Sequence, residues 1–364
     1  MWIKRSAGGR TAVLLAILTL ATGLATGTRA GFDEQHTFTA DELLINNLIG
    51  ELRVKGGGST FEVSVRVQGR DASRDEIQIK TREGGQAELS VIFPRGQKRF
   101  VYPNMGRGSR TSFTMDHEKS GWLSSLLGKV GGDRITVTSS GSGMEVWADI
   151  EVSVPSGKSL KVHHGVGQLY AENVNGDLIL HNHSGPVQAS RIDGELEVDT
   201  GSGSVRVEYV NGALLVDTGS GSVTATDCDG DVVNIDTGSG SVKVERIVAS
   251  KLRIDTGSGS VRASSVSADS ALIDTGSGSV TLELDKMGTG DFRIDTGSGR
   301  VTLKLPPEAS AEVRAETGSG GIDLGLDSPV ELKYKDRNEI AFTVGSGAAR
   351  VVLDTGSGGI RITN

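Results

Sequence analysis

The residues with the clearest chemical potential are aspartates in a repeated string. Asp-Thr-Gly-Ser-Gly occurs seven times in the 364-residue chain, and its aspartates are Asp199, Asp217, Asp236, Asp255, Asp274, Asp295 and Asp354. Asp-Thr-Gly also surrounds the catalytic aspartate of pepsin-like proteases. Those enzymes need two carboxylates that share one proton, and each carboxylate comes from a separate large lobe.

The spacing of the copies argues against acid protease chemistry. The aspartates from Asp199 to Asp274 recur at short and almost constant intervals, and Glu316 opens a near-copy. Aromatic residues make up only 4% of the chain, which leaves too few bulky side chains for two protease lobes. We therefore interpret the string as a structural repeat, in which every unit folds in the same way and packs on its neighbours.

Each unit has the pattern of two strands separated by two turns. Apolar residues alternate on both sides of Gly-Ser-Gly, as in Leu196, Val198, Val205 and Val207, which predicts strands with one buried face. Asn-Gly or Asp-Gly pairs between the copies mark the second turn. At Gly-Ser-Gly we expect glycines with positive φ, an aspartate that accepts a turn N–H, and threonines that form a hydroxyl ladder between units.

Two topologies fit these units: coils of a parallel β-solenoid, or hairpins of an antiparallel meander or sandwich. Near-identical units at near-constant spacing favour the solenoid, because equivalent residues of successive coils then stack. Degenerate copies at 163–169 and 181–187 keep the phase, and residues 45–54 follow the template of 198–207. We therefore predict an all-β parallel β-solenoid, right-handed, with the copies stacked serially. Each coil of such a solenoid would contain about 18–21 residues.

The chain divides into three regions. Residues 1–30 combine a basic start, an apolar stretch and a small-residue cleavage site, which predicts a secretory signal peptide and export to the periplasm, cell surface or medium. Residues 31–154 alternate as strands around a basic and aromatic insertion at about 95–135, with a short helix near 122–127. Residues 155–364 form the repeat solenoid. We interpret the insertion as a capping lobe, with a contact surface for a glycan, lipid or partner as the alternative.

The net charge limits the classes of binding partner, and the cysteine count limits disulfide formation. A net charge of −8 disfavours nucleic acid as a partner. Cys228 is the single cysteine, so an internal disulfide is excluded. We expect an envelope glycan or protein as partner and no cofactor, and exposed end strands could pair rods end to end.

Two sets of side chains could bind ligands once coils stack. An exposed acidic column, which could hold Ca²⁺ weakly, would contain Asp199, Asp217, Asp236, Asp255, Asp274 and Asp295. His163 and His181 fall on the same column and His183 lies two positions further on, so three imidazoles could hold Zn²⁺ or Cu²⁺. The alternative for both sets is a solvated surface.

The string INNLIGELRVKG, the serial DTGSGSV copies and the predicted signal peptide resemble a bacterial family of uncharacterised β-strand-repeat envelope proteins. Members of that family carry the label "putative adhesin", and the resemblance covers most of residues 31–364. It implies an exported β-solenoid and supplies no catalytic residues. We therefore expect a non-enzymatic adhesin or interaction scaffold. The alternatives are a metal- or Ca²⁺-binding envelope protein and a polysaccharide-active β-helix enzyme.

Overall fold

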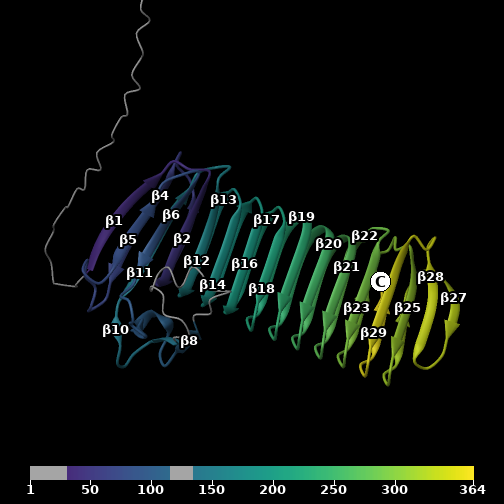
Figure 1. The fold of residues 1–364 in the computed structure, drawn as a ribbon. Coiled ribbons are helices and arrows are strands. Elements are labelled where there is room, and N and C mark those ends of the chain that lie inside the picture. Colours follow the sequence, from purple (N-terminus) through teal and green to yellow (C-terminus); the bar gives the residue numbers. More distant parts are fainter. Residues whose placement is uncertain (1–30, 115–133) are drawn as a thin grey trace, which may run out of the picture.

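Alternation of apolar and polar residues builds a rod of two long sheets around one core. The computed structural model describes residues 31–114 and 134–364. Figure 1 shows the strands side by side along the rod. The predicted signal peptide and the helix expected near residues 122–127 lie outside the described residues.

One sheet, here called the first face, is built on the strands that lead into the Gly-Ser-Gly turns. Its hydrogen-bonded order along the rod is β5 (Gln78–Arg82), β6 (Gln86–Ile92), β2 (Glu42–Ile49), β12 (Ser159–Val166), β14 (Leu178–Ser184), β16 (Leu196–Ser202), β18 (Leu214–Thr218), the C-terminal parts of β19 (Val223–Thr237), β20 (Val242–Thr256) and β21 (Val261–Thr275), then β23 (Asp291–Thr296), β29 (Ala349–Thr355), β25 (Ala311–Thr317), β28 (Glu339–Val344) and β27 (Val330–Lys335).

The other sheet, here called the second face, is built on the strands that follow those turns. Its order is β1 (Gly31–Phe38), β4 (Phe61–Gln68), β11 (Trp147–Val154), β3 (Leu52–Gly56), β13 (Leu169–Asn175), β15 (Val187–Asp193), β17 (Val205–Asn211), the N-terminal parts of β19, β20 and β21, then β22 (Val280–Met287), β24 (Val301–Lys304), β30 (Ile360–Thr363) and β26 (Ile322–Gly325).

Successive coils pair in parallel register. On the first face, Leu160, Leu178, Leu196 and Leu214 are consecutive partners, each one coil beyond the last. The register then continues through the longer coils that follow, as far as β23. The parallel β-solenoid is therefore confirmed, and antiparallel pairs join strands at its two ends. The right-handed coil stays a prediction.

Aliphatic side chains fill the space between the two faces. In one coil, Leu196 and Val198 of the first face share the core with Val205 and Val207 of the second, and each is at most 1% exposed. Burial of such a side chain is worth roughly 1.5–3 kcal/mol relative to exposure. Because each coil contacts its neighbours, the core is one continuous column.

The threonine of the repeat occupies the buried corner between the faces. Thr256 accepts the N–H of Gly259 at 3.1 Å and donates its hydroxyl to the carbonyl of Gly240 in the neighbouring coil at 3.0 Å. Within the described residues the same two bonds recur at Thr218, Thr237, Thr275, Thr296, Thr317 and Thr355. The longest of them joins the Thr218 hydroxyl to the Gly203 carbonyl at 3.4 Å. The expected hydroxyl ladder is wrong, because the threonine hydroxyl bonds to backbone groups on both sides. The expected aspartate-capped turn is also wrong, because this hydroxyl accepts the turn N–H in place of the carboxylate.

Gly-Ser-Gly is required because neighbouring coils approach very closely at this corner. A Cβ added to Gly259 would lie 1.8 Å from the carbonyl oxygen of Gly240, and one added to Gly240 would lie 1.9 Å from that of Gly221. The expected positive φ at this turn is wrong. Positive φ occurs at glycines of the other turn, such as Gly176 at 150° and Gly212 at 145°. At the Gly-Ser-Gly corner it occurs in the degenerate copies, at Gly167 and Gly185.

The C-terminal coil departs from chain order. β29, which carries Asp354, lies between β23 and β25 and is parallel to both; Figure 1 shows it there. β30 likewise lies between β24 and β26. Strictly serial stacking is therefore wrong at this end, because Asp354 rather than Glu316 follows Asp295 in the rod. The hairpin of β27 and β28 covers β25 and carries the chain back inward.

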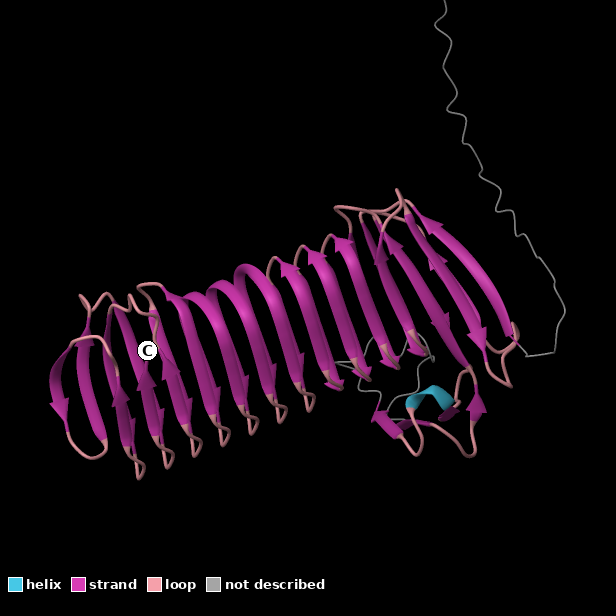
Figure 2. Ribbon diagram, turned by 180° about the vertical axis from the view of Figure 1, so that it is seen from behind, coloured by secondary structure: helices cyan, strands magenta, loops and turns pink. Residues whose placement is uncertain are grey.

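The insertion forms a small separate sheet that the sequence did not predict. Its order is β10 (Met144–Glu145), β7 (Arg99–Val101), β9 (Arg134–Thr138) and β8 (Arg110–Thr114), with a 3-10 turn η1 (Pro103–Met105). Figure 2 shows this lobe beside the turns of the first coils. Such short strands give little alternation to detect. In the described ranges, no helix is long and apolar enough to cross a membrane.

Replacement of Thr256 by valine tests the corner bonds. Valine keeps the shape but leaves the Gly240 carbonyl and the Gly259 N–H without their side-chain partner. Since each unsatisfied buried group costs about 1–3 kcal/mol, we expect a loss of about 2–4 kcal/mol in urea denaturation. Thr256→Ser keeps the hydroxyl and should lose only about 1 kcal/mol. Equal losses for the two variants would contradict this account.

Candidate functional site

The repeat aspartates form one continuous column on the outer surface of the first face. Asp199, Asp217, Asp236, Asp255, Asp274 and Asp295 are consecutive register partners. Asp354 and Glu316 extend the column toward the C-terminal end. The predicted acidic column is therefore present, and its carboxylates lie on an open surface rather than in a cleft between lobes.

Stacking at about 4.8 Å between strands places like charges close together. Partial burial, followed by repulsion from neighbouring carboxylates, raises the pKa of Asp236 and Asp274 above the usual range. Arginines two positions earlier relieve part of this repulsion. Arg253 donates to Asp255 and Arg293 donates to Asp295, each at 3.1 Å. Backbone pairing and the buried core therefore hold the carboxylates close together despite their mutual repulsion.

The three predicted histidines lie at the N-terminal end of the column. His163 and His181 are register partners whose rings stack with centroids 5.4 Å apart. His163 contacts Asn46 at 2.9 Å and His181 contacts Glu197 at 3.3 Å. Within the described ranges, no group of three or more His, Cys, Asp or Glu residues is arranged to hold a metal ion. The structure thus stacks two of the histidines and does not assemble them with His183 as ligands.

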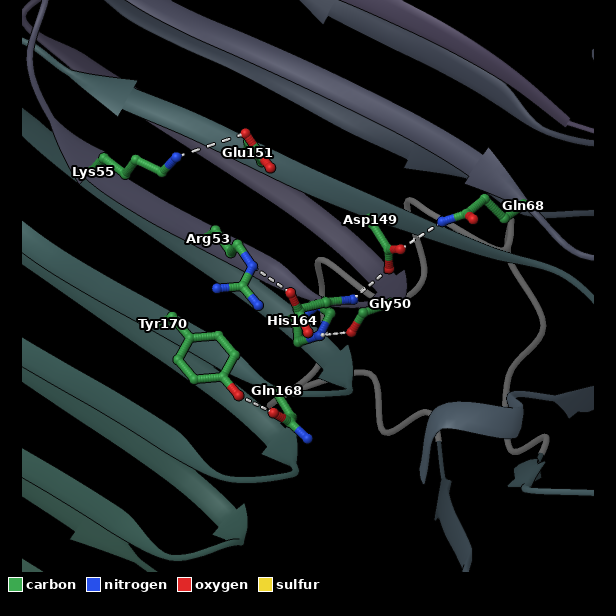
Figure 3. Close-up of polar contacts among 10 residues, drawn as sticks. Gly50, Arg53, Lys55, Gln68, Asp149, Glu151, His164, Gln168 and Tyr170 are labelled. Carbon is green, nitrogen blue, oxygen red and sulfur yellow. Dashed lines mark hydrogen bonds and ion pairs between the residues drawn. The ribbon is translucent and has the colours of Figure 1, made fainter. Parts of the chain in front are cut away.

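A fourth histidine, His164, was not among the predicted site residues, because strand alternation turns it inward, away from the outward column of His163 and His181. It is fully buried and occupies the corner position of the later threonines, between Asn47 and Asn182. Its Nε2–H donates to the Gly50 carbonyl at 3.0 Å, as Figure 3 shows. Burial lowers the pKa of His164 to about 4. His164 is therefore a neutral structural donor.

A second candidate site lies on the second face, in the least regular coils. Arg53, Tyr170, Gln188 and Arg206 are consecutive register partners on β3, β13, β15 and β17. The guanidinium carbon of Arg53 lies 4.7 Å from the Tyr170 ring centroid, and Figure 3 shows both side chains on neighbouring strands. All four residues line a hollow of about 220 Å³. The repeat spacing aligns these residues and could have revealed the site.

Asp149 lies on β11 within the second face and has a structural role. Its carboxylate accepts the Glu51 N–H at 2.8 Å and the Gln68 amide at 2.6 Å (Figure 3). Burial raises the pKa of Asp149 above the usual range, although these hydrogen bonds oppose the shift. Glu51 immediately precedes β3 and Gln68 ends β4, and these are the two strands that flank β11, so the carboxylate joins three strands.

Comparison with known proteins gives one family and two distant structures. A family model described as Toastrack DUF4097 matches residues 132–363. A "putative cell adhesion protein" from Clostridium sporogenes ATCC 15579 is 12% identical, with 92% of this chain and 99% of that chain covered and a TM-score of 0.21. A "putative adhesin" from Bacteroides fragilis NCTC 9343 is also 12% identical, with 92% and 98% covered and a TM-score of 0.31. No curated protein matches the chain.

His164 makes stability depend on pH. The unfolded chain takes up a proton below about pH 6.5 while the folded protein resists until about pH 4, so stability falls across that window. The shift corresponds to about 3 kcal/mol. His164→Asn, which copies Asn182, should lose less stability than the wild type when urea denaturation is repeated from pH 7 down to about pH 4. His163 is common to both proteins, so parallel pH profiles would contradict a role for His164.

Asp236→Asn tests repulsion within the acidic column. It removes a charge that lies between Asp217 and Asp255, so we expect a stability gain of about 0.5 kcal/mol at neutral pH, since solvent screens such pairs. The raised pKa means that acid neutralises the folded column first, so the gain should vanish as the pH falls through that range. Asp269→Asn, an exposed acid outside the column, should have no effect. A gain that persists in acid would exclude repulsion as its cause.

Proposed function

The chain belongs to the Toastrack DUF4097 family, and we propose that it is an exported, non-enzymatic interaction module of the bacterial cell envelope, of the adhesin or scaffold type. The observation that carries this proposal is the set of outward columns that run along both faces. A rigid rod that repeats the same side chains at one strand spacing presents many equivalent weak contacts. Such multivalent presentation yields strong overall attachment from individually weak interactions.

The surroundings of the carboxylates support binding rather than catalysis. Catalytic acids are typically set apart from their neighbours by burial and by distinct partners. Here Asp217, Asp236 and Asp274 share one environment, in which burial and adjacent carboxylates shift their pKa values in the same direction. The column therefore resembles a repeated contact surface, and it lies where the coils are most regular.

Binding to isolated bacterial envelopes tests the proposal. The full chain, processed by a secreting host, should cosediment with envelopes and should fractionate outside the cytoplasm. Conversion of Asp236, Asp255 and Asp274 to asparagine should weaken cosedimentation several-fold, since the column loses three adjacent contacts. Binding should persist in part, because the second face is unchanged.

A charge-matched control separates the column from net charge. Conversion of the exposed residues Asp229, Asp269 and Asp285 to asparagine removes the same charge from outside the column and should leave binding unchanged. Melting curves of both triple variants verify that they fold. A cytoplasmic location, or intact protein that fails to bind envelopes, would overturn the proposed function, and equal losses in both variants would remove the column from it.

A further inference from the structure

The hollow on the second face lies where a short side chain stands between two long ones in the same column. Glu172, Ser190 and Glu208 are register partners two positions beyond Tyr170, Gln188 and Arg206. Ser190 is the shortest side chain of its column here, so the surface sinks between two glutamates. Figure 3 shows the Arg53 and Tyr170 end of this region, on the outer surface of neighbouring strands.

The walls of the hollow combine an aromatic ring with several charged and polar side chains. The Tyr170 hydroxyl donates to Gln168, and Arg53 pairs with Glu51. Arg206 Nη1 lies 3.7 Å from Glu208 Oε1, and Arg191 Nη2 lies 3.9 Å from Glu172 Oε2. These ion pairs hold donors and acceptors next to one another on a rigid sheet, an arrangement suited to a ligand with adjacent hydroxyl groups.

The backbone beneath the hollow is not available to a peptide. β13 is paired with β3 on one side and β15 on the other, and β15 is paired with β17, so an extended segment cannot add to the sheet there. Three cations, Arg53, Lys55 and Arg206, and two carboxylates line the hollow, so its charges nearly cancel and favour a neutral ligand over a strongly charged one. The inward residues Val54, Ala171 and Ala189 form the floor below the polar walls.

Size limits the ligand as well. The hollow measures about 220 Å³, below the roughly 300–1,000 Å³ of pockets for drug-sized molecules. It therefore has room for one sugar ring rather than a whole oligosaccharide. Rungs continue at about 4.8 Å along the same column, close to the advance of one sugar in an extended glycan chain.

We infer that this hollow binds one ring of a neutral glycan that lies along the rod, with the ring packed between Tyr170 and Arg206. Gln188 and Ser190 would bond its hydroxyls from below. The inference rests on the proposed envelope-binding function and names a ligand class for its second face. Neighbouring sugars would follow the column toward Thr224 and Lys243, the next register partners.

Saturation-transfer NMR with defined oligosaccharides tests the site. The full chain is mixed separately with cellotetraose, chitotetraose, maltotetraose and xylotetraose at millimolar concentration. At least one should receive saturation from the protein. The signal should fall at least several-fold in Tyr170→Ala and in Ser190→Arg, which fills the hollow, and should remain in Arg262→Ala, which alters the same column four rungs beyond Gln188.

The outcomes separate this inference from the proposed function. No saturation with any of the four sugars, or equal saturation in all variants, would overturn the glycan site. If Tyr170→Ala and Ser190→Arg also cosediment with envelopes as well as the wild type, the envelope function stands and only the glycan site fails. Circular dichroism of each variant verifies that a lost signal reflects the hollow rather than the fold.

Discussion

The close approach of successive backbones at the Gly-Ser-Gly corner is the constraint on which the rod depends. Each coil must place a glycine within contact of the preceding glycine carbonyl, since a Cβ at Gly259 would lie 1.8 Å from the Gly240 oxygen. The carbonyl that is thereby buried needs a donor, and Thr256 supplies it at 3.0 Å. Glycine thus allows the close approach, and threonine supplies the hydrogen bond that the buried carbonyl needs. The outward columns are in register because this corner repeats in every such coil.

The same constraint is met with other chemistry in the N-terminal coils. Asn182 donates to the carbonyls of Gly167 and Gly185 at 3.0 Å, and His164 donates to Gly50. These coils lack the Asp-Thr-Gly string, yet they stack on the later ones without a break. Asparagine, histidine and threonine thus all fill this buried corner, and each has a side chain that can donate to a carbonyl. The Thr200 hydroxyl, at the junction between the two kinds of coil, is buried without a hydrogen bond.

Much of the fold could be predicted from the sequence, because period-two alternation and constant spacing report directly on strands and stacking. Alignment of the copies also placed Asp199 to Asp295 in one column. The role of each turn residue could not be predicted, since Asp, Thr and Gly can each cap or bend a turn. Only the distance between coils shows that glycine is selected for space and threonine for hydrogen bonding. The hollow at Tyr170 and Ser190 is formed by residues that differ between copies, so the recurring motif does not mark it, although the coil spacing aligns its residues.

The place of β29 and β30 within the rod bears on how the protein is made. Coils up to β24 can form one after another as the chain is released, because each pairs with a coil that precedes it in sequence. β25 and β26 pair instead with β29 and β30, which are synthesised later. β25, β28 and β27 can pair with one another as soon as residue 344 has emerged. They join the rod only through β29 and β30, so this docking requires residues 349–363. Coil-by-coil folding during synthesis therefore ends at β24. The strands beyond it join the rod only when β29 and β30 have been synthesised.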